Sequence, residues 1–374
     1  MKFSDIIRKK GDGNPEPDEP GRPPSPALPR PAESGPPSAP YAPEETDAAI
    51  ELRVAAHALS ATEVYTEVLG AARAIYRSVQ ASGGALATPR EPLIKLIALM
   101  QSGNEEILAL ADRSTPDNFL YSHVVNVAVF SIRLGMALNL PKEDLFALAL
   151  GALLHDLGMV SCMALAMKPA RLTEAEKNEI RKHPQESQRL LSLFSDLAGT
   201  LRNDVHCIAG QVHERVQGAG YPEGLRGEGI HRLAKLVAVC DTYEALTHVR
   251  PWRQRALPHE ALRLLIEKHE MEFEQGTVKT LIEALSLYPP GSFVRLNSGE
   301  MGRVIFTNPG LPTRPRIRIL IDASGNRVPG PKVVNLATQP IVYVAEAVDE
   351  TRIACKDQKL LLELRAQRWW VKGI

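Results

Sequence analysis

The sequence predicts a mainly α-helical protein, in which an N-terminal helical region and a helical bundle are followed by a small antiparallel β module. Apolar residues recur at intervals of three and four almost throughout residues 46–288, as buried helix faces require. Alanine and leucine are abundant while aromatic residues make up 5% of the chain, which also favours helix. After residue 288 this pattern gives way to short runs of Val, Ile and Phe, which are typical of strands.

Composition and charge exclude several classes of function. The 374 residues are enough for two or more domains. The formal net charge is zero, so the composition shows no excess of basic residues that would indicate nucleic-acid binding. No uninterrupted apolar run approaches eighteen residues, so we expect no membrane span, and the first residues lack the apolar core of a signal peptide. The four cysteines are scattered without a CxxC pair, which predicts free thiols in a cytoplasmic protein.

The pattern divides the chain into five parts. Residues 1–45 are rich in Pro, Gly, Ser and Glu and are predicted to be disordered, most simply as a passive linker. Residues 46–115 form an N-terminal helical region, which we expect to serve in packing or in homodimerisation. Residues 116–288 form the main helical domain and residues 289–350 the β module, while residues 351–374 are a C-terminal tail whose two tryptophans should pack against the body or a partner.

Helix boundaries are marked by local signals. Ser60-Ala-Thr-Glu63 and Thr173-Glu-Ala-Glu176 fit the capping box, and Leu140-Pro141 places proline at a first helical position. Residues 120–138 show the spacing of one buried helix face, and residues 145–157 are apolar nearly all round, which predicts a central helix.

The β module is predicted from five short runs separated by turn residues. The runs are FVRLN, MGRVIFT, RIRILI, KVVNL and IVYVAE. Ser298-Gly-Glu300, Ala323-Ser-Gly-Asn326 and Pro329-Gly-Pro331 punctuate them, as expected for an antiparallel arrangement.

Several histidines and aspartates occur where a metal site would favour them. His155-Asp156 ends the central apolar helix, and Gly158 follows as a helix stop. Because adjacent helical residues diverge by about 100°, this pair can address two points of one cluster, with Asp156 bridging. The other candidates are His123, His183, His213 and Asp241. Each of these residues alone is more often an ordinary core or surface residue, so only the set points to a metal.

The set and its surroundings resemble a known family. The order H…HD…H…H…D resembles the HD phosphohydrolase superfamily, and the segments HDLG, KHP, HERVQGAGYPEGLRGEGI and VAVCDTYEALTHVRPWR narrow the resemblance to the HD-GYP family. The match runs from about Asn118 to Leu265, and the GYP triplet is intact at Gly220-Tyr221-Pro222.

The resemblance implies an HD-type helical bundle with a divalent metal centre, often of iron or manganese, that hydrolyses cyclic di-GMP to pGpG or GMP. One metal would be held by His123, His155, Asp156 and Asp241, and Asp156 would bridge to a second metal that also takes His183 and His213. Arg250, Arg253 and Tyr221 match positions at the substrate, where arginine suits phosphate because its planar fork binds two oxygens. Asp156 would be the key catalytic carboxylate, because it bridges the metals that activate water.

The sequence departs from the family pattern at five positions. Val212 replaces the first of two consecutive histidines, and Met159 replaces a lysine near the scissile phosphate. Gln217 replaces the aspartate before the GYP triplet, and Phe119 replaces the glutamate found in three-metal members, so we expect one or two ions. Glu244 replaces an aspartate and keeps the carboxylate. Losing one electrostatic stabiliser commonly costs about 100- to 1,000-fold in rate, which predicts reduced activity.

Three hypotheses follow. The first is a cyclic di-GMP phosphodiesterase with a reduced metal centre, favoured because buried Asp and His are costly without a metal to satisfy them. The second is a catalytically weak or inactive signalling scaffold that binds nucleotide or GGDEF-type partner proteins, favoured by Val212 and Met159. The third, an HD-type hydrolase for another nucleotide, is disfavoured by the intact GYP triplet.

Overall fold

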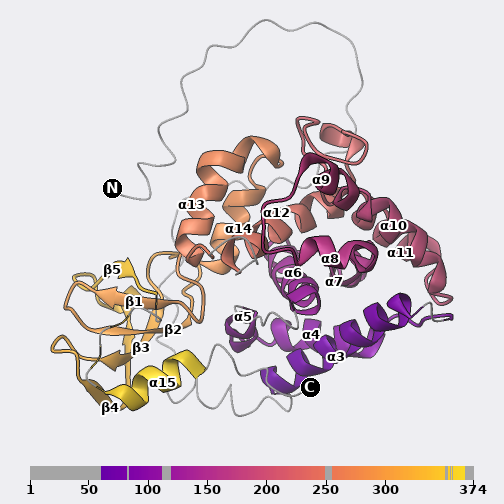
Figure 1. Cartoon of the computed structure of the whole chain (residues 1–374). Helices are drawn as coiled ribbons and strands as arrows, with labels where there is room; N and C mark the ends of the chain where they lie inside the picture. The colour runs from indigo at the N-terminus through magenta and orange to yellow at the C-terminus, as the bar shows by residue number, and fades with distance from the viewer. Residues whose placement is uncertain are drawn as a thin grey trace, which may run out of the picture. The chain divides into compact units, whose positions relative to one another are not determined.

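The computed structural model describes residues 60–81, 84–111, 119–248 and 255–349, together with residues 353, 355 and 357–366 (Figure 1). The chain divides into a unit of residues 1–45 and a unit of residues 46–374, and every described residue belongs to the second unit. The predicted disorder of residues 1–45 and the packing of the C-terminal tryptophans therefore lie outside the described residues. The predicted fold class is confirmed: helices dominate, and a small antiparallel sheet follows them.

Three helices form the N-terminal region: α3 (Ala61–Gln80), α4 (Arg90–Gln101) and α5 (Glu106–Leu110). Ser60 is the N-cap of α3, as the sequence predicts, but its side chain makes no capping hydrogen bond within the described structure, so the capping box is wrong there. Two tyrosines on the buried face of α3 donate their hydroxyls across to the next helices. Tyr65 donates to Asn126 and Tyr76 to the Leu153 carbonyl.

The centre of the bundle is formed by α6 (Phe119–Ala137) and α7 (Lys142–Leu154), which match the two helices predicted from apolar spacing. Pro141 is the N-cap of α7 and so lies one residue earlier than predicted. The segments Phe119–Ala137 and Lys142–Ala166 are long and apolar enough to cross a membrane, yet 83% of each apolar window is buried inside the protein. Core packing therefore accounts for their composition.

The remaining helices surround this pair. The capping box predicted at Thr173 is confirmed: the Glu176 N–H donates to the Thr173 hydroxyl and the Thr173 N–H to the Glu176 carboxylate. Pro184 lies in the first turn of α10. The helices that surround α6 and α7 are η2 (Leu157–Cys162), α8 (Met163–Ala166), α9 (Glu174–Ile180), α10 (His183–Leu190), η3 (Leu191–Leu193), α11 (Gly199–Gln211), η4 (Gly227–Gly229), α12 (Arg232–Thr247), α13 (Pro258–His269), η5 (Glu270–Glu272) and α14 (Thr277–Leu285).

The β module is a five-stranded antiparallel sheet with the order β4-β3-β2-β1-β5. Its strands are β1 (Phe293–Leu296), β2 (Met301–Phe306), β3 (Arg316–Ile321), β4 (Arg327–Asn335) and β5 (Val344–Ala347). The prediction that Pro329-Gly-Pro331 punctuates the strands is wrong, because these residues lie inside β4. They fall between the pairs Ile321↔Arg327 and Ile319↔Lys332, where the register shifts. An edge strand tolerates proline at such an irregularity because its outer N–H groups need no partner strand.

A helix that the sequence analysis did not anticipate, α15 (Gln358–Ala366), follows the sheet and lies beside β3 and β4 in Figure 1. Leu360, Leu361 and Leu364 of α15 share a buried cluster with Phe293 and Ile321 of the sheet. A second apolar cluster contains Val294, Val304 and Ile317, so the neighbouring β1 residues Phe293 and Val294 serve different clusters.

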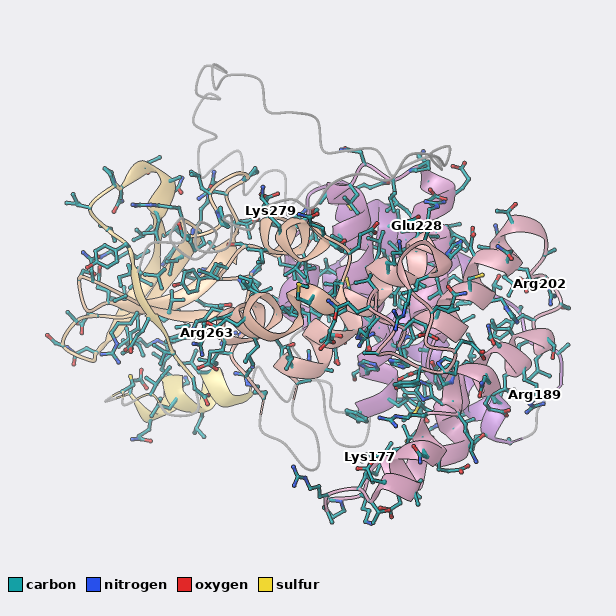
Figure 2. The ribbon with its side chains drawn as sticks, turned by 90° about the horizontal axis from the view of Figure 1, so that it is seen from above. Lys177, Arg189, Arg202, Glu228, Arg263 and Lys279 are labelled. Atoms are coloured by element: carbon teal, nitrogen blue, oxygen red, sulfur yellow. The ribbon has the colours of Figure 1, made fainter. Side chains whose placement is uncertain are left out.

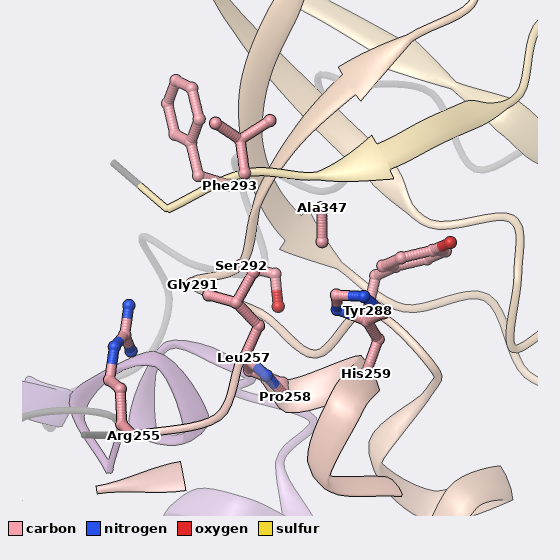
Figure 3. A pocket seen from close by; sticks show the side chains of 10 residues that line it. Arg255, Leu257, Pro258, His259, Tyr288, Gly291, Ser292, Phe293 and Ala347 are labelled. Carbon is pink, nitrogen blue, oxygen red and sulfur yellow. The ribbon is translucent and has the colours of Figure 1, made fainter. Parts of the chain in front are cut away.

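Two features connect the sheet module to the helices. The Glu105 carboxylate, just before α5, accepts hydrogen bonds from the Thr307 backbone N–H and hydroxyl, both at 2.6 Å, and pairs with Arg133 of α6 at 3.3 Å. A small pocket lies between the start of α13 and strands β1 and β5 (Figure 3). His259, Tyr288 and Ser292 line this pocket, and none of its lining residues is a predicted site residue.

Several charged side chains at the periphery, among them Lys177, Arg189 and Lys279 in Figure 2, pair within a single helical turn. Lys177 pairs with Glu174 at 2.6 Å, Arg189 with Glu186 at 2.6 Å, and Lys279 with Glu283 at 3.8 Å. Exposed pairs of this kind contribute roughly 0.3–0.5 kcal/mol each. The fold therefore depends on the buried apolar surfaces rather than on these ion pairs.

Candidate metal centre

The bundle brings all six predicted ligand residues to one place, although they are separated by up to 118 positions in the sequence. Two groups of three side chains result, and within each group the potential ligand atoms lie within 4.8 Å of one another. The first group is His123, His155 and Asp241, and the second is Asp156, His183 and His213.

Helix ends deliver most of these side chains. His155 and Asp156 directly follow α7, His183 begins α10, and His213 comes two residues after the end of α11. Side chains at helix ends can converge from several helices without the steric conflict of helix middles. Helices α6 and α12 contribute His123 and Asp241 from their buried faces.

Asp156 lies between the two groups. Its Oδ2 is 3.4 Å from His123 Nε2, while its Oδ1 is 3.1 Å from His183 Nε2, 3.5 Å from His155 Nε2 and 3.9 Å from His213 Nε2. One oxygen thus faces the first group and the other chiefly faces the second, which is the arrangement that a bridging carboxylate needs.

Three of the histidines are oriented by an acceptor at Nδ1. His155 Nδ1 is 2.7 Å from the Ala152 carbonyl, and His183 Nδ1 is 2.7 Å from the Ile180 carbonyl. His123 Nδ1 is 2.6 Å from the Glu244 carboxylate. Since these acceptors hold the proton at Nδ1, Nε2 of each ring faces the cluster, as a metal-binding imidazole requires.

The ionised carboxylates of the centre favour the binding of a cation. Burial raises the pKa of Asp156, but the surrounding histidines, His155 foremost, outweigh it and hold that pKa well below its ordinary value. The pKa of Asp241 is lowered against burial in the same way, mainly by His123 and His213. Burial also lowers the pKa of His123, yet the carboxylates around it, led by Glu244, raise it well above its ordinary value. Two ionised carboxylates therefore draw a cation into the site.

The donor atoms fit a divalent metal. Burial lowers the pKa of His213 to about 4, so its imidazole is neutral at neutral pH, and its Nε2 lies 2.9 Å from that of His183. His155 Nε2 and Asp156 Oδ1 are buried without a hydrogen-bond partner among the described residues. Such orphaned atoms are costly unless something else satisfies them. Imidazole and carboxylate together suit a borderline divalent ion such as Fe or Mn.

The loop after α11 is organised by Glu214, a residue that the sequence analysis did not single out. Glu214 is 2% exposed, and its carboxylate accepts hydrogen bonds from the backbone N–H groups of Glu223, Gly224 and Leu225 at 2.7–3.1 Å. The sequence signal was an acidic residue directly before a glycine-rich turn. At Gly220, a Cβ would lie 2.5 Å from the His213 carbonyl and from the Glu214 Cα, so only glycine allows this close return of the chain.

This loop places Tyr221 against the cluster. The ring of Tyr221 stacks on that of His213, with centroids 4.9 Å apart and an interplanar angle of 18°. The Arg181 guanidinium lies 5.7 Å from the centroid of the Tyr221 ring. Burial raises the pKa of the Tyr221 hydroxyl, so it remains protonated and can donate a hydrogen bond. The two other predicted substrate residues, Arg250 and Arg253, lie outside the described residues.

The prediction that Gly158 stops a helix is wrong. The chain continues after α7 as the short helix η2, and Gly158 has no left-handed backbone angle. Its role is close packing instead: a Cβ would lie 2.2 Å from the His183 carbonyl and 2.7 Å from the Ser187 N atom. The Gly158 N–H also donates to the Ser187 hydroxyl at 2.8 Å, which holds α10 and His183 near Asp156.

Three of the five positions that depart from the family pattern are occupied by apolar packing residues. Val212 is fully buried, and Met159 is 9% exposed with its Sδ 3.6 Å from the Cys162 thiol. Phe119 stacks on His123 with ring centroids 6.5 Å apart. Gln217 forms an isolated bridge with Arg226 in the loop. The first three side chains are thus integrated into the core around the centre, where they add no ligand.

Comparison with known proteins agrees with this geometry. The family model described as "HD domain" matches residues 97–274, and the model described as "KOW domain associated with HD domain" matches residues 293–356. The helical body and its histidine–aspartate cluster thus define a protein of the HD domain class, followed by a small β domain that accompanies it.

Curated relatives narrow the class. A Pseudomonas aeruginosa protein named cyclic di-GMP phosphodiesterase PA4108 is 35% identical over 61% of this chain and 54% of its own length. The Xanthomonas campestris protein named cyclic di-GMP phosphodiesterase response regulator RpfG is 34% identical over 39% of this chain and 38% of its own. A Vibrio cholerae protein named 3'3'-cGAMP-specific phosphodiesterase 3 is 28% identical over 48% of this chain and 38% of its own.

Residues 97–274 match the HD domain family, and the names of the curated relatives together with the intact Gly220-Tyr221-Pro222 triplet support the HD-GYP family for this chain. The chain spans about half the length of the first of these relatives and less of the other two. A solved structure titled Bd1817, a HDG"Y"P protein from Bdellovibrio bacteriovorus, aligns at 22% identity with a TM-score of 0.49, covering 59% of this chain and 70% of that chain.

Proposed function

We propose that this chain is a metal-dependent phosphodiesterase that hydrolyses cyclic di-GMP to pGpG or GMP. The observation that carries the proposal is the convergence of two His/Asp groups on the shared carboxylate of Asp156. The names of the Pseudomonas and Xanthomonas relatives support cyclic di-GMP as the substrate.

The residues divide into two ligand sets. His123, His155 and Asp241 would hold one ion together with Asp156, and His183 and His213 would hold a second ion, also together with Asp156. The buried orphaned atoms of His155 and Asp156 support this assignment, because coordination would satisfy both. Iron or manganese suits these ligands.

When bound, a pair of such ions supplies an activated water and stabilises the charge that develops on the phosphoryl oxygens. The protein residues position the substrate around this chemistry. Tyr221, fixed against His213 by stacking, would donate its hydroxyl to the nucleotide at the rim of the centre. Arg250 and Arg253 would clamp the phosphates, since a guanidinium binds two phosphate oxygens at once.

A second candidate function is a catalytically weak scaffold that binds nucleotide or GGDEF-type partner proteins through the GYP loop, with homodimerisation as a further property. The observation in its favour is the burial of Val212 and Met159, which place apolar side chains where the family has a ligand and a cation. Each replacement removes a group that would stabilise charge in the transition state.

The test is hydrolysis by purified protein whose iron and manganese contents have been measured. With added Mn²⁺ we expect cyclic di-GMP turnover that Asp156→Ala abolishes, and 3'3'-cGAMP is assayed in parallel to decide the substrate. Turnover equal to that of Asp156→Ala rejects the enzyme and supports the scaffold.

Restoring the family residues tests the reason for reduced activity. Val212→His combined with Met159→Lys should raise kcat by tenfold or more, because single electrostatic stabilisers are worth about 100- to 1,000-fold. The steric control Val212→Leu with Met159→Leu should give no increase. An unchanged kcat in the restored variant, with the fold intact by circular dichroism, contradicts the account of the two departures.

A further inference from the structure

Glu244 is the buried carboxylate on which a hydrogen-bonded network behind the metal centre converges. It is 1% exposed, and its Oε2 lies 2.6 Å from His123 Nδ1. Its other oxygen, Oε1, lies 3.4 Å from Asn126 Nδ2 and 3.2 Å from His248 Nδ1. Asn126 and His248 are also buried, so the network is shielded from solvent. Hydrogen bonds to a charged group are strongest in such a buried environment.

The chemistry of the carboxylate fixes the direction of the hydrogen bonds that Glu244 receives from His123 and Asn126. A carboxylate can only accept, so His123 presents its Nδ1–H and Asn126 its amide NH₂ to Glu244. The Asn126 Oδ1 then faces away and accepts from the Tyr65 hydroxyl at 2.7 Å. Tyr65 therefore donates to Asn126, and both Asn126 and His123 donate to Glu244.

The network reaches beyond the region that the HD family model matches. Tyr65 belongs to α3, which ends at Gln80, whereas the matched region begins at residue 97. The centre is thus connected to the N-terminal helical region by three side-chain hydrogen bonds: Tyr65 to Asn126, Asn126 to Glu244 and His123 to Glu244.

We propose that Glu244 and Tyr65 are positioning residues for His123, so that helix α3 helps to set the metal affinity of the centre. The inference rests on the proposed metal centre. Among the described residues, the Nδ1 anchors of His155 and His183 are backbone carbonyls, whereas that of His123 is a side chain. Of these three histidines, His123 is therefore the one whose Nδ1 partner can be changed by substitution.

The experiment is a titration of the full-length, metal-free protein with Mn²⁺ by calorimetry. Removing a carboxylate partner of a metal-bound histidine typically weakens metal binding by about 10- to 100-fold. We expect Glu244→Leu, which removes the acceptor, to show this loss, and Glu244→Gln, which keeps an amide oxygen, to show a smaller one. Tyr65→Phe should weaken binding by a few fold.

Tyr76→Phe is the matched control. It removes a buried tyrosine hydroxyl from the same helix, but that hydroxyl donates to the Leu153 carbonyl and not to the network. Its Mn²⁺ affinity should equal that of the wild type, even where its melting temperature falls as much as that of Tyr65→Phe. Equal affinities for wild type, Glu244→Leu and Glu244→Gln would overturn the inference.

A double-variant cycle tests whether Tyr65 acts through Glu244. In the Glu244→Gln background, Tyr65→Phe should have little further effect on the Mn²⁺ affinity, because the hydrogen bonds from Asn126 and His123 to residue 244 are already weakened. Fully additive effects would reject the connection from α3 to the metal centre.

A readout without metal separates this inference from the proposed function. In protein with ¹⁵N-labelled histidine, the His123 Nδ1–H should give a far-downfield proton signal that persists in Tyr76→Phe and disappears in Glu244→Leu. If the wild-type protein shows this signal but binds no Mn²⁺, the proposed metal centre is rejected, while the hydrogen bond between Glu244 and His123 is established. Persistence of the signal in Glu244→Leu rejects the positioning role whatever the metal result.

Discussion

At the scale of single residues, Glu214 fixes the loop that carries Tyr221. Its carboxylate accepts three backbone N–H groups, and it directly follows the metal-site residue His213 in the chain. Hydrogen bonds to a charged group contribute about 1.5–3 kcal/mol each. The same residue therefore couples the position of His213 to the shape of the GYP loop.

Replacing this carboxylate should loosen the loop. In Glu214→Gln one of the two oxygens becomes an NH₂ group that faces backbone donors, so we expect faster hydrogen exchange at the Glu223, Gly224 and Leu225 amides, by about tenfold or more. The exposed neighbour provides the control Glu223→Gln, which should leave exchange unchanged. Unaltered protection in Glu214→Gln would show that the carboxylate does not hold the loop.

The sequence could predict the six candidate ligands but not the residues that orient them. His155, Asp156 and His183 stand at helix ends that apolar spacing and proline indicate, and the family resemblance supplied the rest of the set. Glu214 and Glu244 act through contacts that are made only after the chain has folded. Their roles depend on distances across the bundle, which no local pattern encodes.

At the scale of elements, the close packing of η2 on α10 determines whether the second ligand group forms. Gly158 has no side chain because the His183 carbonyl occupies the space where a Cβ would lie. Local sequence suggested a helix stop at this glycine, since a close approach between distant segments leaves no trace in the neighbouring residues.

Adding one methyl group here should separate the two elements. Gly158→Ala forces α10 away from Asp156, so we expect a loss of about 1–3 kcal/mol in stability and weaker metal binding by the Asp156, His183 and His213 group. In the control Gly229→Ala, the added Cβ meets nothing within 4 Å. A Gly158→Ala protein with wild-type melting temperature and metal content would contradict the packing argument.

The helix α15 belongs to the β module because it buries leucines against the sheet. Leu364 is 2% exposed whereas Leu362, on the opposite side of the helix, is 66% exposed. Leu364→Ala should destabilise the protein by about 2–5 kcal/mol, and Leu362→Ala should have almost no effect. Urea unfolding monitored by circular dichroism measures both, and equal midpoints for the two variants would show that α15 does not complete the module.

At the scale of the whole molecule, the metal centre is a product of the folded bundle. Its ligands come from α6, α12 and the ends of α7, α10 and α11, so no fragment of the sequence contains the site. Apolar spacing predicted the helices and short β-branched runs predicted the strands. The missed helix α15 and the irregular course of β4 are both settled by packing at the sheet, which spacing along the chain does not report.

The most direct test of the metal centre is the location of bound ions by anomalous X-ray diffraction from crystals soaked in Mn²⁺. We predict a peak among His123, His155 and Asp241, and a second, weaker one among His183, His213 and Asp156, with Asp156 between the two. Crystals of Asp156→Ala should lose the second peak and weaken the first. An absence of peaks at these six side chains in the wild type, or ions bound only elsewhere, would contradict the account.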